Sequence, residues 1–125
     1  MENGELKMEK KKDIIERAFK FGVAVIKTAD SLPKTPVGFA IANQLVRSGT
    51  SVGANIEEAQ DGLTRKEFIR SMSIALKEAR ETRFWLRIAV ESGTLFTKKV
   101  GTVLNESEEL IKILVTIVKK SKMKL

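Results

Sequence analysis

The sequence predicts an all-α protein, an antiparallel up-down-up-down four-helix bundle formed as one domain over residues 1–125. Apolar residues recur at three- and four-residue steps through four long segments, which is typical of helices with a buried face. No segment carries a strand signal. The only prolines, Pro33 and Pro36, lie together in one short connection, so they interrupt no other part of the chain. Short connections force consecutive helices to run antiparallel.

The first two helices are expected at about 10–31 and 36–60. Thr35 is the expected N-cap of the second helix, and Pro36 suits the first helical position because its missing N–H costs nothing there. In the first helix a wide apolar stripe is predicted to face the core, and a second group lies off that stripe. The stripe is Ile15, Ala18, Phe19, Gly22, Val25, Ile26 and Ala29, and the second group is Ile14, Phe21 and Val23.

The last two helices are expected at about 65–91 and 97–120. Thr64 and Glu67 have the spacing of a capping box, in which each side chain satisfies an exposed backbone N–H of the other residue. Gly93 is the expected stop of the third helix, and Thr94 or Thr97 the cap of the fourth. The predicted core seam of the third helix is Phe68, Met72, Ala75, Ala79, Thr82, Leu86 and Ala89.

The composition removes several classes of function. Without cysteine there is neither a disulfide framework nor a thiolate metal site, and a reducing cytoplasm is the expected location. Without histidine the chain lacks the commonest general base and metal ligand, so we expect no metal, no cofactor and no small-molecule substrate. No apolar run is long enough to span a membrane, so no membrane partner is expected.

A segment of small and polar residues, 47–59, falls within the second helix. Its helix propensity is poor, so it must be stabilised by close packing. Four of its polar residues share one helix face, and an arginine there can reach acids on the third helix, within one chain or between subunits. The predicted structural polar network is Arg47, Ser51, Asn55, Glu58, Glu78, Glu81 and Thr82. The alternative is a catalytic site, but hydroxyls need an adjacent base to become nucleophiles, and no histidine is present.

Several features favour a homo-oligomer over a monomer. Gly49 and Gly53 are spaced four apart and allow another backbone to approach closely. Trp85 lies on an apolar strip that adds more apolar surface than one four-helix core needs to bury. We therefore predict these three residues at a subunit interface. Alternatively, the extra apolar strips are covered by the tails or are ordinary surface.

Two blocks give the chain a family resemblance. Residues Arg47–Ala59 and Phe68–Leu86 resemble the signatures of the four-helix-bundle protein family, also called the 23S ribosomal RNA intervening-sequence protein or S23 family. The resemblance implies a ring, typically a homopentamer. Some family members are encoded inside insertions in 23S rRNA genes, and the accessory variability determinant proteins of diversity-generating retroelements are similar in fold. A common form of the family has Gly-Ser where this chain has Lys77-Glu78, so the polar contacts there can differ.

The net charge of +7 favours anionic partners. An up-down-up-down bundle brings both termini and the turn between the second and third helices to one end. The candidate nucleic-acid-binding residues there are Lys10, Lys11, Lys12, Arg65, Lys66, Arg70, Lys119, Lys120, Lys122 and Lys124. The sequence thus indicates a non-enzymatic, homo-oligomeric scaffold that binds RNA or a ribonucleoprotein through a basic rim. The alternative is a structural assembly that binds only protein, its lysines being solvated.

Overall fold

The computed structural model describes residues 8–125, with side chains described for residues 11–96, 98 and 100–125. Within this range the chain forms four helices: α1 (Met8–Asp30), α2 (Pro36–Gln60), α3 (Arg65–Glu91) and α4 (Thr97–Lys122). The prediction of an all-α chain with four helices is confirmed, and no strand occurs among the described residues.

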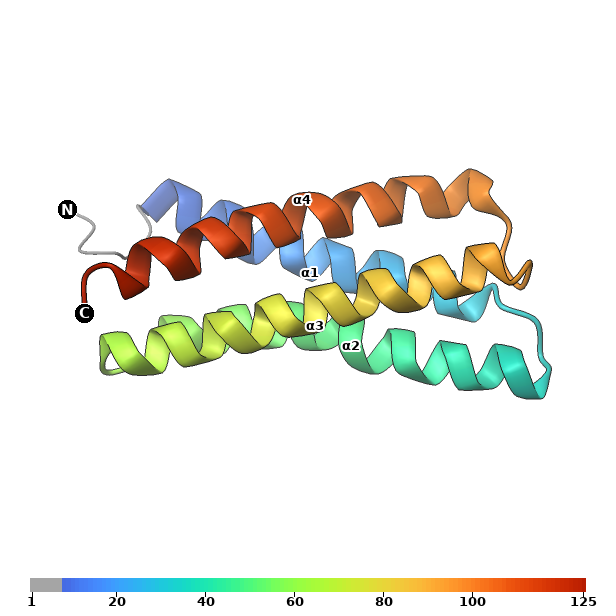
Figure 1. Cartoon of the computed structure of the whole chain (residues 1–125), viewed down its shortest axis with the longest axis horizontal. Coiled ribbons are helices and arrows are strands. Elements are labelled where there is room, and N and C mark those ends of the chain that lie inside the picture. The colour runs from blue at the N-terminus through green and yellow to red at the C-terminus, as the bar shows by residue number, and fades with distance from the viewer. Residues whose placement is uncertain (1–7) are drawn as a thin grey trace.

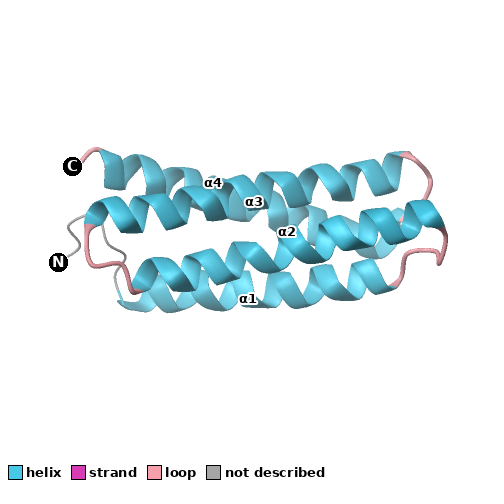
Figure 2. Cartoon of the chain, turned by 90° about the horizontal axis from the view of Figure 1, so that it is seen from below, coloured by secondary structure: helices cyan, strands magenta, loops and turns pink. Residues whose placement is uncertain are grey.

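The four helices lie alongside one another in an elongated body (Figures 1 and 2). The α1–α2 and α3–α4 connections lie at one end of this body. The α2–α3 turn lies at the other end, together with the beginning of α1 and the C-terminus (Figure 1). Residues from three distant parts of the sequence therefore meet at that second end, which we call the termini end.

The beginnings of α2 and α3 follow from local side-chain chemistry. The Gly38 N–H donates to Thr35 Oγ1 at 3.1 Å, and the Glu67 N–H donates to Thr64 Oγ1 at 3.1 Å. The Glu67 carboxylate accepts from the Leu63 N–H at 2.8 Å, one residue before the position expected for a capping box. The two threonine contacts each satisfy a backbone donor in the first turn of a helix, and the Glu67 contact satisfies one just before α3.

The beginning of α4 differs from the prediction. Phe96 occupies the N-cap position and makes no side-chain capping bond, while Thr97 is already helical. Thr94 is engaged before the helix, where its hydroxyl lies 2.8 Å from that of Ser92 and its N–H donates to the Ala89 carbonyl. Gly93, with φ at 78°, turns the chain into this arrangement after α3. The turn that ends α3 therefore uses Thr94, one of the two threonines expected to cap α4.

The core of α1 is a correction to the sequence prediction. Ile14 and Phe21 are buried, whereas Phe19 is 61% exposed and Ile26 is 45% exposed. Ala18, Val25 and Ala29 are buried as expected. The helix carries two overlapping apolar stripes, and periodicity alone does not say which stripe faces the other helices. In α3 the seam predicted from the sequence is buried throughout its length.

The glycines of α2, predicted at a subunit interface, pack against α1 of the same chain. A Cβ atom on Gly49 would lie 2.5 Å from Val25 Cγ1, and one on Gly53 would lie 3.3 Å from the Ala18 carbonyl oxygen. On α1, a Cβ on Gly22 would lie 3.6 Å from the Gly49 carbonyl oxygen. Helices α1 and α2 therefore cross in close contact at these glycines.

A contact that the sequence did not reveal joins α1 to α4. Arg17 donates to both carboxylate oxygens of Glu106, from Nε at 2.9 Å and from Nη2 at 2.8 Å. The hydrogen bond to Glu106 raises the pKa of Arg17 above its ordinary value, the nearby carboxylates reinforce the effect, and burial opposes it. This two-pronged geometry holds the first and last helices in register.

Candidate functional site: a polar network, an apolar groove and a basic end

A polar network links the middle of α2 to α3. Arg47 Nη1 donates to Glu78 Oε1 at 3.2 Å, and Arg47 Nη2 donates to Glu81 Oε2. Trp85 Nε1 donates to the same Glu81 oxygen at 3.2 Å. The Arg47 side chain is 47% exposed and that of Glu78 only 12%, so the pairs lie at the edge of the interface between the helices. They form within one chain.

The buried part of the network is a pair of hydroxyls. Thr82 Oγ1 lies 2.8 Å from Ser48 Oγ and 2.7 Å from the Glu78 carbonyl oxygen, and both side chains are fully buried. Ser48 was not among the predicted network residues, although it shares the seam of α2 with apolar neighbours. A small hydroxyl in each of two facing seams is the signal that could have identified this contact.

The remaining predicted network residues do not reach α3. Ser51 donates to the Arg47 carbonyl at 2.7 Å, and Asn55 donates to the Ser51 carbonyl at 2.8 Å, so both bond to their own helix. Glu58 is exposed and faces away from the network. The network therefore consists of Arg47, Ser48, Glu78, Glu81, Thr82 and Trp85.

The chemistry of this network is that of a fixed helix pairing. Each hydroxyl is hydrogen-bonded, and both acids already pair with Arg47. Over the described side chains, every buried polar atom has a hydrogen-bond partner. Within the same residues no group of three or more acids gathers as a metal site would require. Such a network sets the register between two helices.

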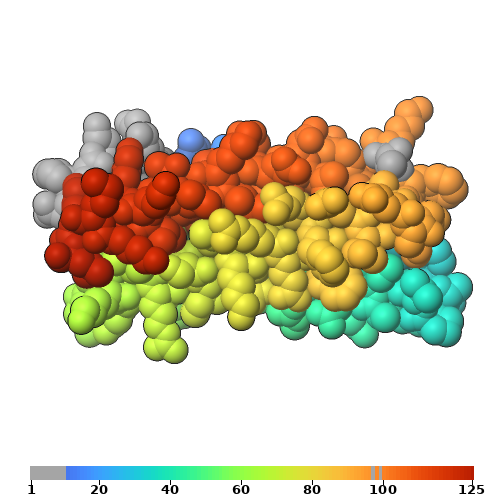
Figure 3. Space-filling model, viewed as in Figure 1, coloured from blue at the N-terminus to red at the C-terminus, as the bar shows by residue number. Residues whose placement is uncertain are grey.

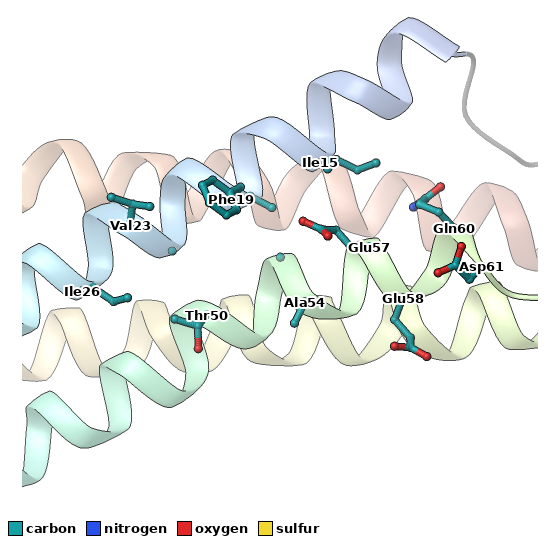
Figure 4. Close-up of a pocket in the computed structure, with 13 residues that line it drawn as sticks. Ile15, Phe19, Val23, Ile26, Thr50, Ala54, Glu57, Glu58, Gln60 and Asp61 are labelled. Atoms are coloured by element: carbon teal, nitrogen blue, oxygen red, sulfur yellow. The ribbon is translucent and has the colours of Figure 1, made fainter.

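An apolar groove opens between α1 and α2 (Figure 4). It has a volume of about 900 Å³. Figure 4 shows Ile15 and Phe19 on α1 across from Glu57 and Gln60 on α2, where the two ribbons draw apart. The residues lining it are Ile15, Ala18, Phe19, Gly22, Val23, Ile26, Thr50, Gly53, Ala54, Glu57, Glu58, Gln60 and Asp61. The lining is thus apolar on the α1 side and acidic towards the end of α2.

The basic residues predicted from the sequence come from α1, α3, α4 and the residues after α4, which meet at the termini end. Most of these side chains are exposed, and Lys11 and Arg65 are half-buried; they are Lys11, Lys12, Arg65, Lys66, Arg70, Lys119, Lys120, Lys122 and Lys124. The Lys10 side chain lies outside the described residues. Helix α2 brings Glu57, Glu58 and Asp61 to the same end. The end is therefore basic over α1, α3 and α4 and acidic over α2, rather than a uniform basic rim.

Trp85, predicted at a subunit interface, is half-buried against the core. Its ring meets that of Phe84 edge to face, with the ring centres 5.2 Å apart and the planes at 80°. Phe84 is 52% exposed, so the outer surface of α3 carries the aromatic ring that Trp85 supports. The face that α3 and α4 present to solvent is shown in Figure 3.

Comparison with known proteins places these features in a family. Residues 10–116 match the family model described as 23S rRNA-intervening sequence protein. The chain belongs to this family. A crystal structure from the S23 ribosomal protein family of Bacteroides thetaiotaomicron VPI-5482, described as a protein with unknown function, is similar to it with a TM-score of 0.79. That protein is 34% identical, and the match covers 85% of the present chain and 98% of the other. No curated protein matches the chain.

The match begins within α1 and ends within α4, so the groove and the polar network lie inside the matched region, whereas Lys119, Lys120, Lys122 and Lys124 of the termini end lie beyond it. No helix in the described part of this intervening-sequence family member is long and apolar enough to cross a bilayer.

Proposed function

We propose that this 23S rRNA-intervening sequence family member is a non-enzymatic scaffold. Its antiparallel four-helix bundle assembles with copies of itself into a ring, for which the family resemblance suggests five subunits. The assembled ring binds RNA or a ribonucleoprotein through the basic part of the termini end. The observation that carries this proposal is the convergence of exposed lysines and arginines from α1, α3 and α4 at one end of the bundle.

The exposed apolar residues support self-assembly. Phe19, Val23 and Ile26 lie on one side of α1 and remain 61%, 40% and 45% exposed. Large apolar patches of this kind usually mark an interaction surface. Burial against another copy would remove them from water without any change in the fold.

The charge supports an anionic partner. Phosphate backbones attract clustered cations over long distances, largely independently of sequence. Each copy adds a net charge of +7, so a ring with all termini ends on one side concentrates that charge. The described aromatic rings are not gathered at this end, so recognition through the phosphates fits better than base stacking.

The polar network supports a role without catalysis. The hydroxyls of Ser48 and Thr82 are hydrogen-bonded to each other, and the carboxylates of Glu78 and Glu81 both pair with Arg47. A nucleophile or general base must be free to exchange a proton with a substrate. These groups are instead committed to holding α2 against α3.

The RNA-binding part is tested by a mobility-shift titration of single-stranded RNA at two salt concentrations. The variant carries Lys119→Gln, Lys120→Gln and Lys122→Gln at the termini end. The matched control loses the same charge at the opposite end through Lys27→Gln, Lys34→Gln and Lys98→Gln. We expect only the first variant to bind more weakly, with the slope of log K against log salt reduced by about 2, at ~0.7 per lost phosphate contact. Absence of binding at low salt, or equal losses in both variants, would overturn this proposal.

A second candidate, an assembly that binds only another protein, is favoured by one observation. Glu57, Glu58 and Asp61 place negative charge beside the basic residues, which repels a phosphate backbone over α2. A protein that co-purifies with the chain and stays bound after nuclease treatment supports this candidate.

A further inference from the structure

We propose that the α1–α2 groove of one copy receives the outer face of α3 from a second copy. In this contact Phe84 and Ile88 lie over Val23 and Ile26, and Lys77 and Arg80 approach the acids at the end of α2. The inference rests on the proposed self-assembly and specifies which surfaces meet.

The groove presents one half of a complementary pair. Phe19 is 61%, Ile26 45% and Val23 40% exposed, so its α1 wall is an unpaired apolar surface. Its charged lining residues are Glu57, Glu58 and Asp61, and no lysine or arginine lines it. Among the described residues, none of these three acids forms an ion pair.

The outer face of α3 presents the other half. Lys77, Arg80, Phe84 and Ile88 follow at steps of three, four and four, so they lie along one side of the helix. Phe84 is 52% and Ile88 39% exposed, and both basic residues are exposed. Within the described chain, neither Lys77 nor Arg80 forms an ion pair.

The two surfaces match in length and in order. Ile15 to Ile26 spans about 16 Å along α1, and Lys77 to Ile88 spans the same rise along α3, at ~1.5 Å per residue. The α1 wall of the groove is apolar throughout and its acids lie at the end near Ile15, while the α3 face is basic at Lys77 and Arg80 and apolar at Phe84 and Ile88. Placing the apolar ends together brings Lys77 and Arg80 to the acidic end of the groove, which fixes the direction of docking.

Phe84 is already positioned for this contact. Its ring packs edge to face on Trp85, and the Trp85 indole is held by its hydrogen bond to Glu81. An aromatic side chain that is ordered before binding loses little conformational entropy when it is buried. The polar network around Arg47 thus fixes Trp85, and Trp85 in turn positions Phe84 on the α3 surface.

Pairing of two grooves with each other satisfies the charges less well. Such a contact buries apolar surface, but the lining of each groove is acidic only, so Glu57, Glu58 and Asp61 find no opposite charge. Groove-to-α3 pairing uses two different surfaces on every copy. A contact of that kind repeats from copy to copy and closes into a ring when the rotation permits.

The charges are tested by reversal, with the mass measured by light scattering after size exclusion. One variant carries Glu57→Lys and Asp61→Lys, and the other carries Lys77→Glu and Arg80→Glu. Each alone is expected to lower the association constant at least tenfold. A chain carrying all four changes, or an equimolar mixture of the two variants, is expected to assemble again. The control, Glu108→Lys with Glu109→Lys on α4, is expected to assemble like the unmodified chain.

The apolar contact is tested by mixing. Phe19→Ser removes an apolar side chain from the groove, and Phe84→Ser removes one from the α3 face. Both side chains are more than half exposed, so neither change should unfold the chain. Each variant alone is expected to be a monomer. Their mixture retains one intact groove and one intact α3 face, so it is expected to form a pair of twice the 13.9-kDa chain mass. Circular dichroism and the unfolding midpoint verify that each variant is folded.

The results separate the two proposals. If the unmodified chain assembles while all the variants assemble equally well, the docking inference is overturned and self-assembly stands. If the serine variants give no pair on mixing, or if charge reversal is not rescued, the docking inference is likewise overturned. A monomeric unmodified chain overturns both.

Discussion

Replacement of Gly49 by alanine tests the close crossing of α1 and α2. In an open helix position this substitution stabilises, because alanine is the better helix former by about 1 kcal/mol. At Gly49 the new methyl would meet Val25, whose Cγ1 lies 2.5 Å and whose Cβ lies 2.9 Å from the position of the added carbon. Val25 is fully buried, so it has no free space into which to move.

The expected magnitude follows from these two opposing effects. Forcing an extra carbon into a well-packed core costs about 1–3 kcal/mol, and the improved helix propensity returns up to ~1 kcal/mol. We expect Gly49→Ala to lower the free energy of unfolding by about 1–2 kcal/mol. For a chain of this size the midpoint of thermal unfolding should fall by roughly 4–8 °C.

The assay is urea unfolding followed by helical circular dichroism, at one fixed protein concentration because assembly adds to apparent stability. The control is Gly101→Ala in α4, where an added Cβ meets nothing within 4 Å. This control should stabilise by about 0.5–1 kcal/mol. Val25→Ala should lower the free energy of unfolding less in the Gly49→Ala chain than in the unmodified chain, because it removes the methyl groups that clash with the new alanine. Equal stabilisation by Gly49→Ala and Gly101→Ala would refute the close crossing.

Two further predictions concern the α2–α3 pairing. Thr82→Val leaves the buried Ser48 hydroxyl without its partner and should lower the free energy of unfolding in urea by about 1–3 kcal/mol. Adding Ser48→Ala should recover part of that loss, and no recovery would contradict the pairing. Thr64→Ala removes the acceptor for the Glu67 N–H and should lower the free energy of unfolding by about 1 kcal/mol. The control Thr116→Ala, on the exposed side of α4, should change it little, and equal effects would show that Thr64 is not a cap.

The sequence was sufficient for the number of helices and for the core face of α3. That helix has one continuous apolar seam from Phe68 to Ala89, and all of it is buried. In α1 two apolar stripes overlap; Phe19 and Ile26 were wrongly placed in the core, whereas Ala18, Val25 and Ala29 of the same stripe are buried as predicted. Only the direction in which α1 crosses its neighbours distinguishes the two, and that direction is a property of the assembled bundle.

The candidate sites show the same division. The reach of Arg47 to Glu78 and Glu81 could be anticipated, because helical period places these residues on facing sides of adjacent helices. The contact of Arg17 with Glu106 could not, since 89 residues separate them and only the complete bundle brings α1 beside α4. The groove also escaped prediction, because its width depends on how α1 and α2 diverge from their glycine crossing.

The solution mass of the unmodified chain tests the scaffold proposal most directly. Light scattering with size exclusion should give a multiple of 13.9 kDa that decreases to the single-chain mass in Phe19→Ser, with helical content unchanged. A single-chain mass for the unmodified protein at every concentration would contradict the account.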